Sequence, residues 1–353
     1  MDDPQKVTLR EVARHARVHP ATVCRALNAA TSALVAAETR ERVRRSAEQL
    51  GYRPNVVARS LKASRTYTVA VVVPDVTHAS FSPVVRGVGD ELGARGYTML
   101  VASTDDDPDT ELAVLESMLA RQVDGLVLAA SGGQPAAIAR LCASRRPFVL
   151  VHRVVTGVDV PAVLSDDRKG GWLVAAHLVA LGHRRIAELS GPRWLLTWAM
   201  RHEGLVAGLA RAGVPLDPLL SVETSAPCVQ AGQEAMRELL RRGPPPTAVV
   251  CGDDLLALGS MDVLAQHGLG VPEDVSVTGY NDMPMVDRLA VPLTTVRVPQ
   301  RRMGVAAGRL LANLLVGSPP LRPALRLLDV ELVVRASTAR YLACSRTNGR
   351  SRL

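Results

Sequence analysis

One short stretch of this chain, residues 20–28, carries side chains that could read nucleic acid. Pro20 suits the first position of a helix, because that position needs no backbone donor. A helix from Pro20 would bury Val23, Ala26 and Leu27 and turn another face outward. The outward residues are Ala21, Thr22, Arg25 and Asn28. Arginine and threonine can hydrogen-bond to base edges, and an alanine methyl can contact the methyl group of thymine. The pattern indicates a DNA-reading helix, with a generic helical hairpin as the alternative.

Two further helices are expected to position this one. Thr8 and Glu11 have the spacing of a capping box, in which both side chains satisfy backbone donors at the start of a helix. An apolar face follows at helical spacing: Leu9, Val12, Ala13 and Ala16. Residues 38–50 predict a third helix that ends at Gly51. Together these segments predict a helix-turn-helix domain, in which the first helix supports a second that enters the major groove.

The distribution of charge favours a nucleic-acid partner for this end of the chain. Residues 1–65 carry 13 Lys and Arg against 6 Asp and Glu, whereas residues 66–334 carry 24 against 28. Phosphate neutralisation needs such a local positive field, although a basic leader that only aids solubility is the alternative. No signal peptide precedes Val7, and no apolar run is long enough to span a membrane. We therefore expect a cytoplasmic protein with no membrane partner.

From Thr68 the chain alternates between strands and helices. Strands buried on both faces are predicted by apolar runs at 68–74, 97–103, 125–130, 147–152, 185–190, 247–252 and 275–280. Helical patterns separate them at 84–95, 109–121, 169–181, 200–212, 230–242 and 255–267. This alternation predicts parallel sheets with crossover helices, in two units of about five strands each.

Acidic clusters follow three of the expected strands and could bind a metal ion. They are Asp105–Asp107, Asp166–Asp167 and Asp253–Asp254. Such residues more often cap the next helix, which is the interpretation we prefer. The five cysteines have no paired metal spacing, and the chain lacks phosphate-loop, dinucleotide, zinc-protease and nucleophile-elbow motifs. We expect no metal, no cofactor and no catalytic residue; an enzyme on the same fold is the alternative.

Short motifs in order along nearly the whole chain resemble the LacI/GalR family of bacterial transcription repressors. They are V-T-L-R-E-V-A (7–13), A-T-V (21–23), R-A-L-N (25–28), E-T-R-E-R-V (38–43), G-Y-R-P-N (51–55), A-R-S-L-K (58–62), V-D-G-L-V-L (123–128), L-V-A-L-G-H-R-R-I (178–186), V-P-E-D-V-S-V-T-G-Y (271–280), P-L-T-T-V (292–296) and E-L-V-V-R-A-S-T (331–338). The resemblance implies a small all-α helix-turn-helix domain plus an α/β, two-lobed, periplasmic-binding-protein-like effector domain with two parallel sheets.

The resemblance also implies the limits of each domain. Residues 1–54 would be the helix-turn-helix domain, 55–66 a hinge helix and linker, 67–340 the effector-binding and dimerisation domain, and 341–353 a disordered tail. Within the effector domain, one lobe would comprise about 67–162 with 293–320. The other lobe would comprise 163–292 with 321–340. The crossings between the lobes come from the resemblance and not from the pattern.

The residues that would contact DNA follow from the same resemblance. They are Thr8, His19, Pro20, Ala21, Thr22, Cys24, Arg25, Asn28, Asn55, Ala58, Leu61 and Lys62. The hinge helix is too short to be stable alone, so it would form only on DNA beside the partner subunit. Leu61 stands where the family wedges a leucine into the central base step; ordinary packing is the alternative. Arg17 replaces a common glycine in the turn, where a positive φ is expected to be needed.

The effector contacts expected from the resemblance are Phe81, His152, Trp194, Arg201, Asp253 and Asn281. Arg201 matches an arginine that grips effector hydroxyls or carboxylates, with a surface salt bridge as the alternative. Asp253 stands where the family usually has Asn, and Asn281 where it usually has Asp. His152 stands where an Asp that binds sugar hydroxyls is frequent. Trp194 or Trp198 could supply a stacking face.

We interpret the chain as a homodimeric bacterial regulator, expected to be a repressor. It would bind a near-palindromic operator on the nucleoid and respond to a small-molecule effector, expected to be a carbohydrate, between the two lobes. The C-terminal tail lacks the leucine heptads of a tetramerising coil, which favours a dimer. A secreted solute-binding protein is the alternative, opposed by the helix-turn-helix pattern and the absence of a signal peptide.

Overall fold

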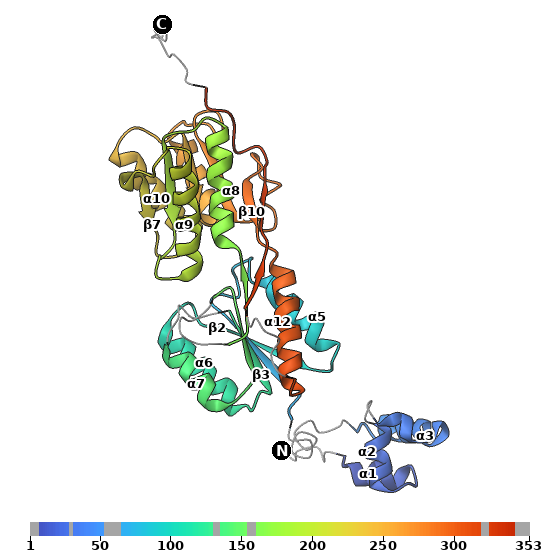
Figure 1. Cartoon of the computed structure of the whole chain (residues 1–353). Coiled ribbons are helices and arrows are strands. Elements are labelled where there is room, and N and C mark those ends of the chain that lie inside the picture. The colour runs from blue at the N-terminus through green and yellow to red at the C-terminus, as the bar shows by residue number, and fades with distance from the viewer. Residues whose placement is uncertain are drawn as a thin grey trace, which may run out of the picture. The chain divides into compact units, whose positions relative to one another are not determined.

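The computed structural model describes residues 7–27, 31–52, 65–129, 135–153, 160–318 and 325–342. The chain divides into two compact units, residues 1–67 and residues 68–353. Each unit has its own buried core and is described by itself below (Figure 1). The residues expected to form the hinge helix lie outside the described residues.

The first unit is a small bundle of helices. It contains α1 (Leu9–His15), α2 (Pro20–Ala26), a 3₁₀ turn (Ser32–Leu34) and α3 (Ala37–Gln49). Thr8 and Glu11 form the predicted capping box: the Glu11 carboxylate accepts from the Thr8 backbone N–H at 2.6 Å. The buried core comprises Val12, Ala13, Ala16, Val23, Ala26, Val35, Val43 and Ala47. Val12, Ala13, Ala16, Val23 and Ala26 of this core belong to the two predicted apolar faces, and the helix-turn-helix prediction is confirmed.

Over its described residues, the second unit contains two sheets of six strands each, one more than the five or so expected. The first sheet has the order β11-β5-β4-β3-β1-β2 and the second has the order β12-β10-β9-β8-β6-β7. The first comprises β1 (Thr68–Val73), β2 (Thr98–Ser103), β3 (Gly125–Leu128), β4 (Phe148–Val151), β5 (Ala162–Ser165) and β11 (Leu325–Leu328). The second comprises β6 (Ile186–Ser190), β7 (Ser221–Glu223), β8 (Ala248–Cys251), β9 (Ser276–Asn281), β10 (Thr294–Arg297) and β12 (Glu331–Val333). The predicted parallel sheets are confirmed, except that β12 pairs antiparallel with β10.

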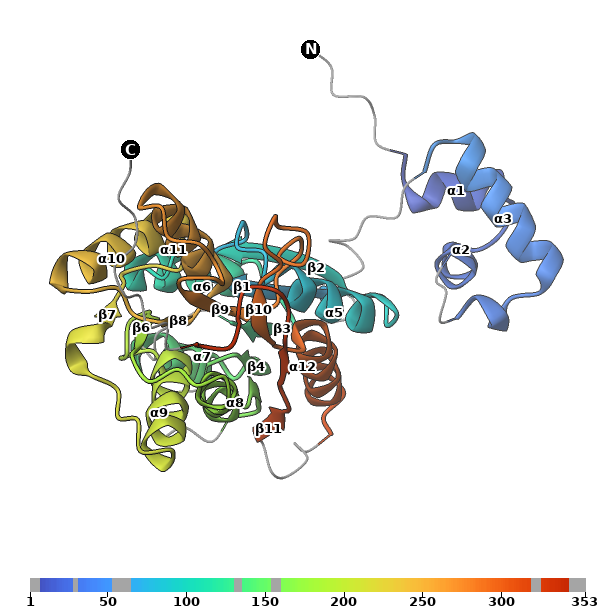
Figure 2. The same cartoon turned by 90° about the horizontal axis from the view of Figure 1, so that it is seen from above.

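Helices cover both faces of each sheet (Figures 1 and 2). Around the first sheet lie α5 (Ser82–Gly93), α6 (Pro108–Ala120), α7 (Pro135–Ser144) and α12 (Gln300–Leu315). Around the second lie α8 (Asp167–Ala180), α9 (Leu196–Arg211), α10 (Val229–Arg242), α11 (Asp254–Gln266) and a 3₁₀ turn (Pro218–Leu220). Helices α8 and α9 approach closely, since a Cβ on Gly171 would lie 2.1 Å from the carbonyl oxygen of Arg201. This close approach fixes where α9 presents its side chains.

The crossings between the lobes differ from the expected lobe limits. Strand β10 pairs with β9, so residues 294–297 belong to the second lobe and not to the first. Strand β11 pairs with β5, so residues 325–328 belong to the first lobe and not to the second. The chain therefore crosses between β5 and α8, between β10 and α12, and between β11 and β12. The sequence of a short apolar strand predicts that the strand is buried, but it does not predict which sheet the strand joins.

Among the described residues, no helix combines the length and the apolar character that crossing a membrane requires.

Candidate DNA-reading face and effector site

The turn before α2 adopts the backbone conformation that the sequence suggested. Arg17 has a φ of 52°, in the left-handed region that glycine adopts most easily. The backbone N–H of Val18 then donates to the carbonyl of Ala13 at 3.0 Å, which closes the turn onto α1. His19 takes over the cap of α2, because its Nδ1 accepts from the backbone N–H of Ala21 at 3.2 Å. Arg17 thus adopts the conformation of the glycine that the family commonly has in this turn, and His19 supplies the helix cap.

Helix α2 turns a polar face to solvent. Val23 and Ala26 are buried, whereas His19, Ala21, Cys24 and Arg25 are exposed and Pro20 and Thr22 are partly exposed. Thr8, at the start of α1, is also exposed. Among the described residues, the guanidinium of the exposed Arg25 has no hydrogen-bond or ion-pair partner. Asn28, Asn55, Ala58, Leu61 and Lys62 lie outside the described residues.

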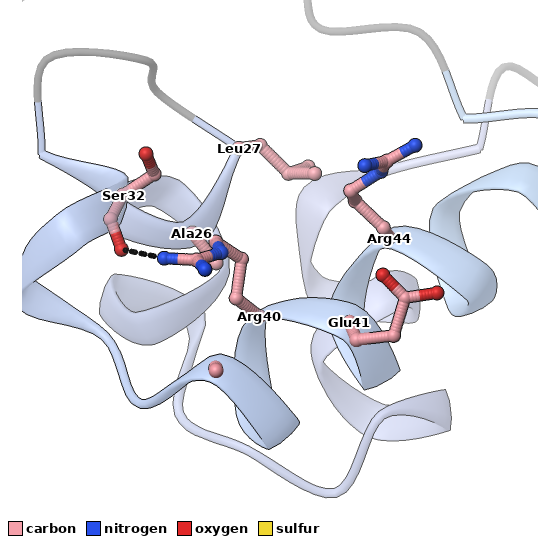
Figure 3. Close-up of a pocket in the computed structure, with 7 residues that line it drawn as sticks. Ala26, Leu27, Ser32, Arg40, Glu41 and Arg44 are labelled. Carbon is pink, nitrogen blue, oxygen red and sulfur yellow. Dashed lines mark hydrogen bonds between the residues drawn. The ribbon is translucent and has the colours of Figure 1, made fainter.

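A surface pocket lies where the end of α2 meets α3 (Figure 3). It is lined by Ala26, Leu27, Ser32, Ala37, Arg40, Glu41 and Arg44. Arg40 donates to the carbonyl of Ser32 at 3.2 Å, which ties α3 to the 3₁₀ turn. Arg44 pairs with Glu48 on its own helix at 3.8 Å. Arg40 and Arg44 therefore have partners within the unit.

One aspartate of each acidic cluster caps a helix, as expected. Asp107 accepts from the backbone N–H of Thr110 at 2.7 Å, Asp166 from Lys169 at 3.0 Å and Asp253 from Leu255 at 2.8 Å. Each contact satisfies a donor at the N-terminus of a helix that follows a strand. Within the described ranges, no group of His, Cys, Asp and Glu has an arrangement that could hold a metal ion.

Arg201 on α9 is the centre of a buried cluster in the second lobe. Its Nε donates to Oδ1 of Asp167 at 2.8 Å, and its Nη1 donates to the carbonyl of Gly252 at 2.7 Å. The guanidinium lies 3.8 Å from the ring centroid of Tyr280 and 5.0 Å from that of Trp198. Its side chain is only 12% exposed, so the pair with Asp167 is buried and is not a surface salt bridge. Burial by itself would lower the pKa of Arg201, but the Asp167 carboxylate raises it, and the guanidinium stays charged.

Asp253 and Asn281 lie next to this cluster and bind each other. The side-chain amide of Asn281 donates to Oδ2 of Asp253 at 2.7 Å, and both residues are buried. The sequence suggested two separate departures from the family pattern, an acid for an amide and an amide for an acid. The structure shows that the two changes are complementary. The amide and the carboxylate have exchanged positions, so the pair comprises one of each, as the usual family residues would.

The first lobe contributes three rings to the same region. His78 and Phe81 lie between β1 and α5, with ring centroids 5.8 Å apart, and His152 follows β4 with its ring 5.7 Å from Phe81. His78 Nε2 lies 3.4 Å from Oδ2 of Asp253, so this contact joins the two lobes. The structure therefore brings together Phe81, His152, Arg201, Asp253 and Asn281 as expected, and adds His78.

His152 is a neutral ring in a strained position. Its φ is 64°, and its backbone N–H donates to the carbonyl of Val163 at 3.0 Å. Burial, with the positive charges of Arg201 and Arg153, lowers its pKa to about 3. The Nε2 atom is buried and has no hydrogen-bond partner among the described residues. A buried unsatisfied ring nitrogen is costly unless something binds to it, which favours a ligand at this position.

The start of α9 determines which tryptophan lies beside Arg201. The ring of Trp198 lies 5.0 Å from the Arg201 guanidinium, whereas Trp194 is 62% exposed. Helix α9 begins at Leu196, four residues before the predicted start, which places Trp198 in its first turn. His78 was missed, although a histidine in the loop after the first strand is a weak signal of a site at the carboxyl edge of the sheet.

Family comparisons agree with both parts of the molecule. Residues 8–55 match the model "Bacterial regulatory proteins, lacI family", and residues 66–319 match "Periplasmic binding proteins and sugar binding domain of LacI family". The chain belongs to the LacI family. This LacI-family chain contains the helix-turn-helix domain and the two-lobed α/β domain that the sequence predicted.

Relatives of known function and structure cover nearly the whole chain. The repressor CytR of Escherichia coli K12 is 31% identical over 331 residues, which is 94% of this chain and 96% of CytR. Catabolite control protein A of Priestia megaterium is 32% identical and covers 87% of this chain and 92% of its own. The Lac repressor dimer bound to operator and the anti-inducer ONPF superposes with a TM-score of 0.85, at 28% identity over 95% of this chain and 100% of that one. A complex of the regulator CelR with cellobiose superposes with a TM-score of 0.72, at 32% identity over 94% and 99%.

Proposed function

We propose that this protein is a transcription repressor that reads operator DNA through the exposed face of α2. The observation that carries the proposal is the exposed Arg25 beside Ala21 and Thr22 on that face, whose guanidinium has no partner among the described residues. A free guanidinium can bind O6 and N7 of a guanine with two donors, and the alanine methyl can contact a thymine. The likeness to a Lac repressor dimer bound to its operator supports a DNA-reading role for α2.

The proposed regulator is a homodimer that binds a near-palindromic site. A two-fold symmetric dimer places two reading helices in successive major grooves, so the site repeats in inverted orientation. Residues 55–66 would supply the hinge, with Asn55 as cap, Ala58 and Lys62 against the backbone and Leu61 as wedge between central base pairs. Pyrimidine–purine steps deform most easily, so we expect a central CG, CA or TA step. The regulator would act in the bacterial cytoplasm, and we propose no catalytic activity for it.

The effector would bind where the two lobes contribute Phe81, His152, Arg201, Asp253 and Asn281. Arg201 retains donors beyond those given to Asp167 and Gly252, and the Nε2 of His152 has no protein partner among the described residues. Stacked rings and fixed polar groups suit a carbohydrate or another polar ring compound. The cellobiose complex of a family member is consistent with this class. Differential binding to two lobe arrangements would then shift the operator affinity.

A thermal-shift screen of sugars, sugar phosphates and nucleobases against the full chain tests the effector site, because a ligand of the native state raises the melting temperature. Each hit is then added to the operator complex in a gel-shift titration. We expect a compound that raises the melting temperature to change operator affinity as well. A hit that binds tightly and leaves operator affinity unchanged would contradict the regulatory role of the site.

A further inference from the structure

One side-chain contact in the effector unit joins an imidazole of one lobe to a carboxylate of the other. His78 Nε2 belongs to the loop before α5. In the second lobe, Asp253 caps α11 through Oδ1, and its Oδ2 faces His78. The two atoms lie 3.4 Å apart, and the residues are only 8% and 2% exposed. A charge-assisted hydrogen bond has a length of about 2.7–2.9 Å, so an approach of roughly half an ångström between the lobes would complete one.

The surroundings of His78 decide which nitrogen carries its hydrogen. Its Nδ1 lies 2.7 Å from the hydroxyl of Ser80 and accepts from the Ser80 backbone N–H at 3.4 Å. In the neutral ring, Nδ1 is therefore the acceptor and Nε2 carries the hydrogen, toward Asp253. A second proton would enter at Nδ1 and turn this nitrogen into a donor to the Ser80 hydroxyl. Protonation therefore exchanges the long contact with the Ser80 backbone N–H for donation to the Ser80 hydroxyl, while Nε2 keeps its hydrogen toward Asp253.

The charges that face His78 come from four elements. Asp253 of α11 and Asp75 of its own loop favour the protonated ring, whereas Arg201 of α9 opposes it. His152 beside β4 is neutral. Burial lowers the pKa of His78, but the two carboxylates outweigh it and the net shift is upward. Asp253 itself is held by the backbone N–H of Leu255 and the amide of Asn281, so its carboxylate cannot turn away easily.

We propose that the proton is a second effector of this protein, bound at His78, and that the charged imidazole holds the first lobe to Asp253 of the second. The closed arrangement brings the carboxylate to the ring and binds the proton more tightly than an arrangement with the lobes apart. Closure is therefore favoured in acid and is lost as the pH rises through the pKa of His78 in the closed form. This inference concerns the lobes alone and does not depend on DNA binding.

The size of the effect is limited by linkage. Each unit by which the pKa of His78 differs between closed and open arrangements changes their ratio by at most about tenfold between low and high pH. Such a change is measurable as a shift in the distance between the lobes. The chain offers two exposed cysteines for this purpose: Cys142 on α7 of the first lobe and Cys228 at the start of α10 of the second.

The test labels Cys142 and Cys228 with a fluorophore pair in the full chain, after Cys24→Ser and Cys344→Ser. Energy transfer is followed from pH 5.5 to 8.5, a range of about one and a half units on either side of neutrality. We expect a single titration in which the lobes separate as the pH rises. His78→Asn and Asp253→Asn should each abolish it, and asparagine at position 253 still caps α11.

The matched control is His202→Asn. His202 also pairs with a buried carboxylate, since its Nδ1 lies 2.8 Å from Glu188 Oε2, but both residues belong to the second lobe. This variant should keep the pH-dependent distance of the unmodified chain. A distance that does not vary with pH in the unmodified chain, or that varies equally in the His78→Asn variant, would overturn the proposal.

Discussion

The side-chain amide of Asn281 donates to Oδ2 of Asp253 over 2.7 Å, although the residues are 28 positions apart in the chain. Two changes that look unrelated in the sequence therefore form one amide–carboxylate pair. Because the pair is buried, a second carboxylate at position 281 should be tolerated only when position 253 becomes an amide.

Asn281→Asp should lower the free energy of unfolding by about 1–3 kcal/mol, because it places two carboxylates together without a donor between them. The exchanged double variant, Asp253→Asn with Asn281→Asp, should recover most of the loss, since the amide then comes from position 253. Urea denaturation of the two variants measures the coupling. If the double variant is as unstable as Asn281→Asp alone, the pair does not contribute as described.

Arg201→Ala should be destabilising by about 3–5 kcal/mol, because it leaves the buried carboxylate of Asp167 without its cation. The double variant Arg201→Met with Asp167→Asn should be much more stable, since it removes both charges and keeps the volume. Both variants should lose the effector response. Urea denaturation measures the loss of stability in each variant. Calorimetry with a ligand found by screening then measures whether the effector still binds without Arg201. Normal effector affinity in the folded double variant would contradict the role of Arg201.

Asp254 gives the protein a predictable dependence on pH. Burial, together with the charge of Asp253, raises its pKa to about 8. The protonated form is favoured in the folded state, so the stability from this group is full below its unfolded pKa of about 3.9 and falls as the pH rises toward 8. Asp254→Asn should flatten this part of the profile. Thermal unfolding between pH 4 and 8 measures how stability depends on pH. If the variant loses stability with rising pH as steeply as the unmodified chain, the raised pKa of Asp254 is contradicted.

Arg25→Ala should weaken binding to the operator by about 1–3 kcal/mol and binding to random DNA much less. The matched variant is Arg25→Lys, which retains the charge but loses the planar pair of donors. Fluorescence anisotropy with both DNAs measures the difference. Equal losses on operator and random DNA would reduce Arg25 to a phosphate contact.

Local patterns in the sequence predicted those parts of the fold that depend on neighbouring residues. The capping box of Thr8 and Glu11, the start of α2 at Pro20 and the aspartate caps all depend on spacings of two to three residues. The buried parallel strands were visible because burial on both faces selects continuous apolar runs.

Long-range relationships were not visible in the same way. Strands β10 and β11 are only four residues long, and their pattern does not record which sheet they pair with. The choice of Trp198 over Trp194 depends on where α9 begins, and helix ends are the least certain feature of a pattern. The contact of His78 with Asp253 depends on how two lobes meet, which no local spacing encodes.

The most direct test of the account is selection of binding sites from a pool of random double-stranded DNA by the full chain. We expect one near-palindromic sequence to be enriched, with a deformable pyrimidine–purine step at its centre. The same selection with Arg25→Ala should relax the preference at one position in each half-site. Recovery of unrelated sequences at equal frequency would contradict the claim that this protein reads an operator.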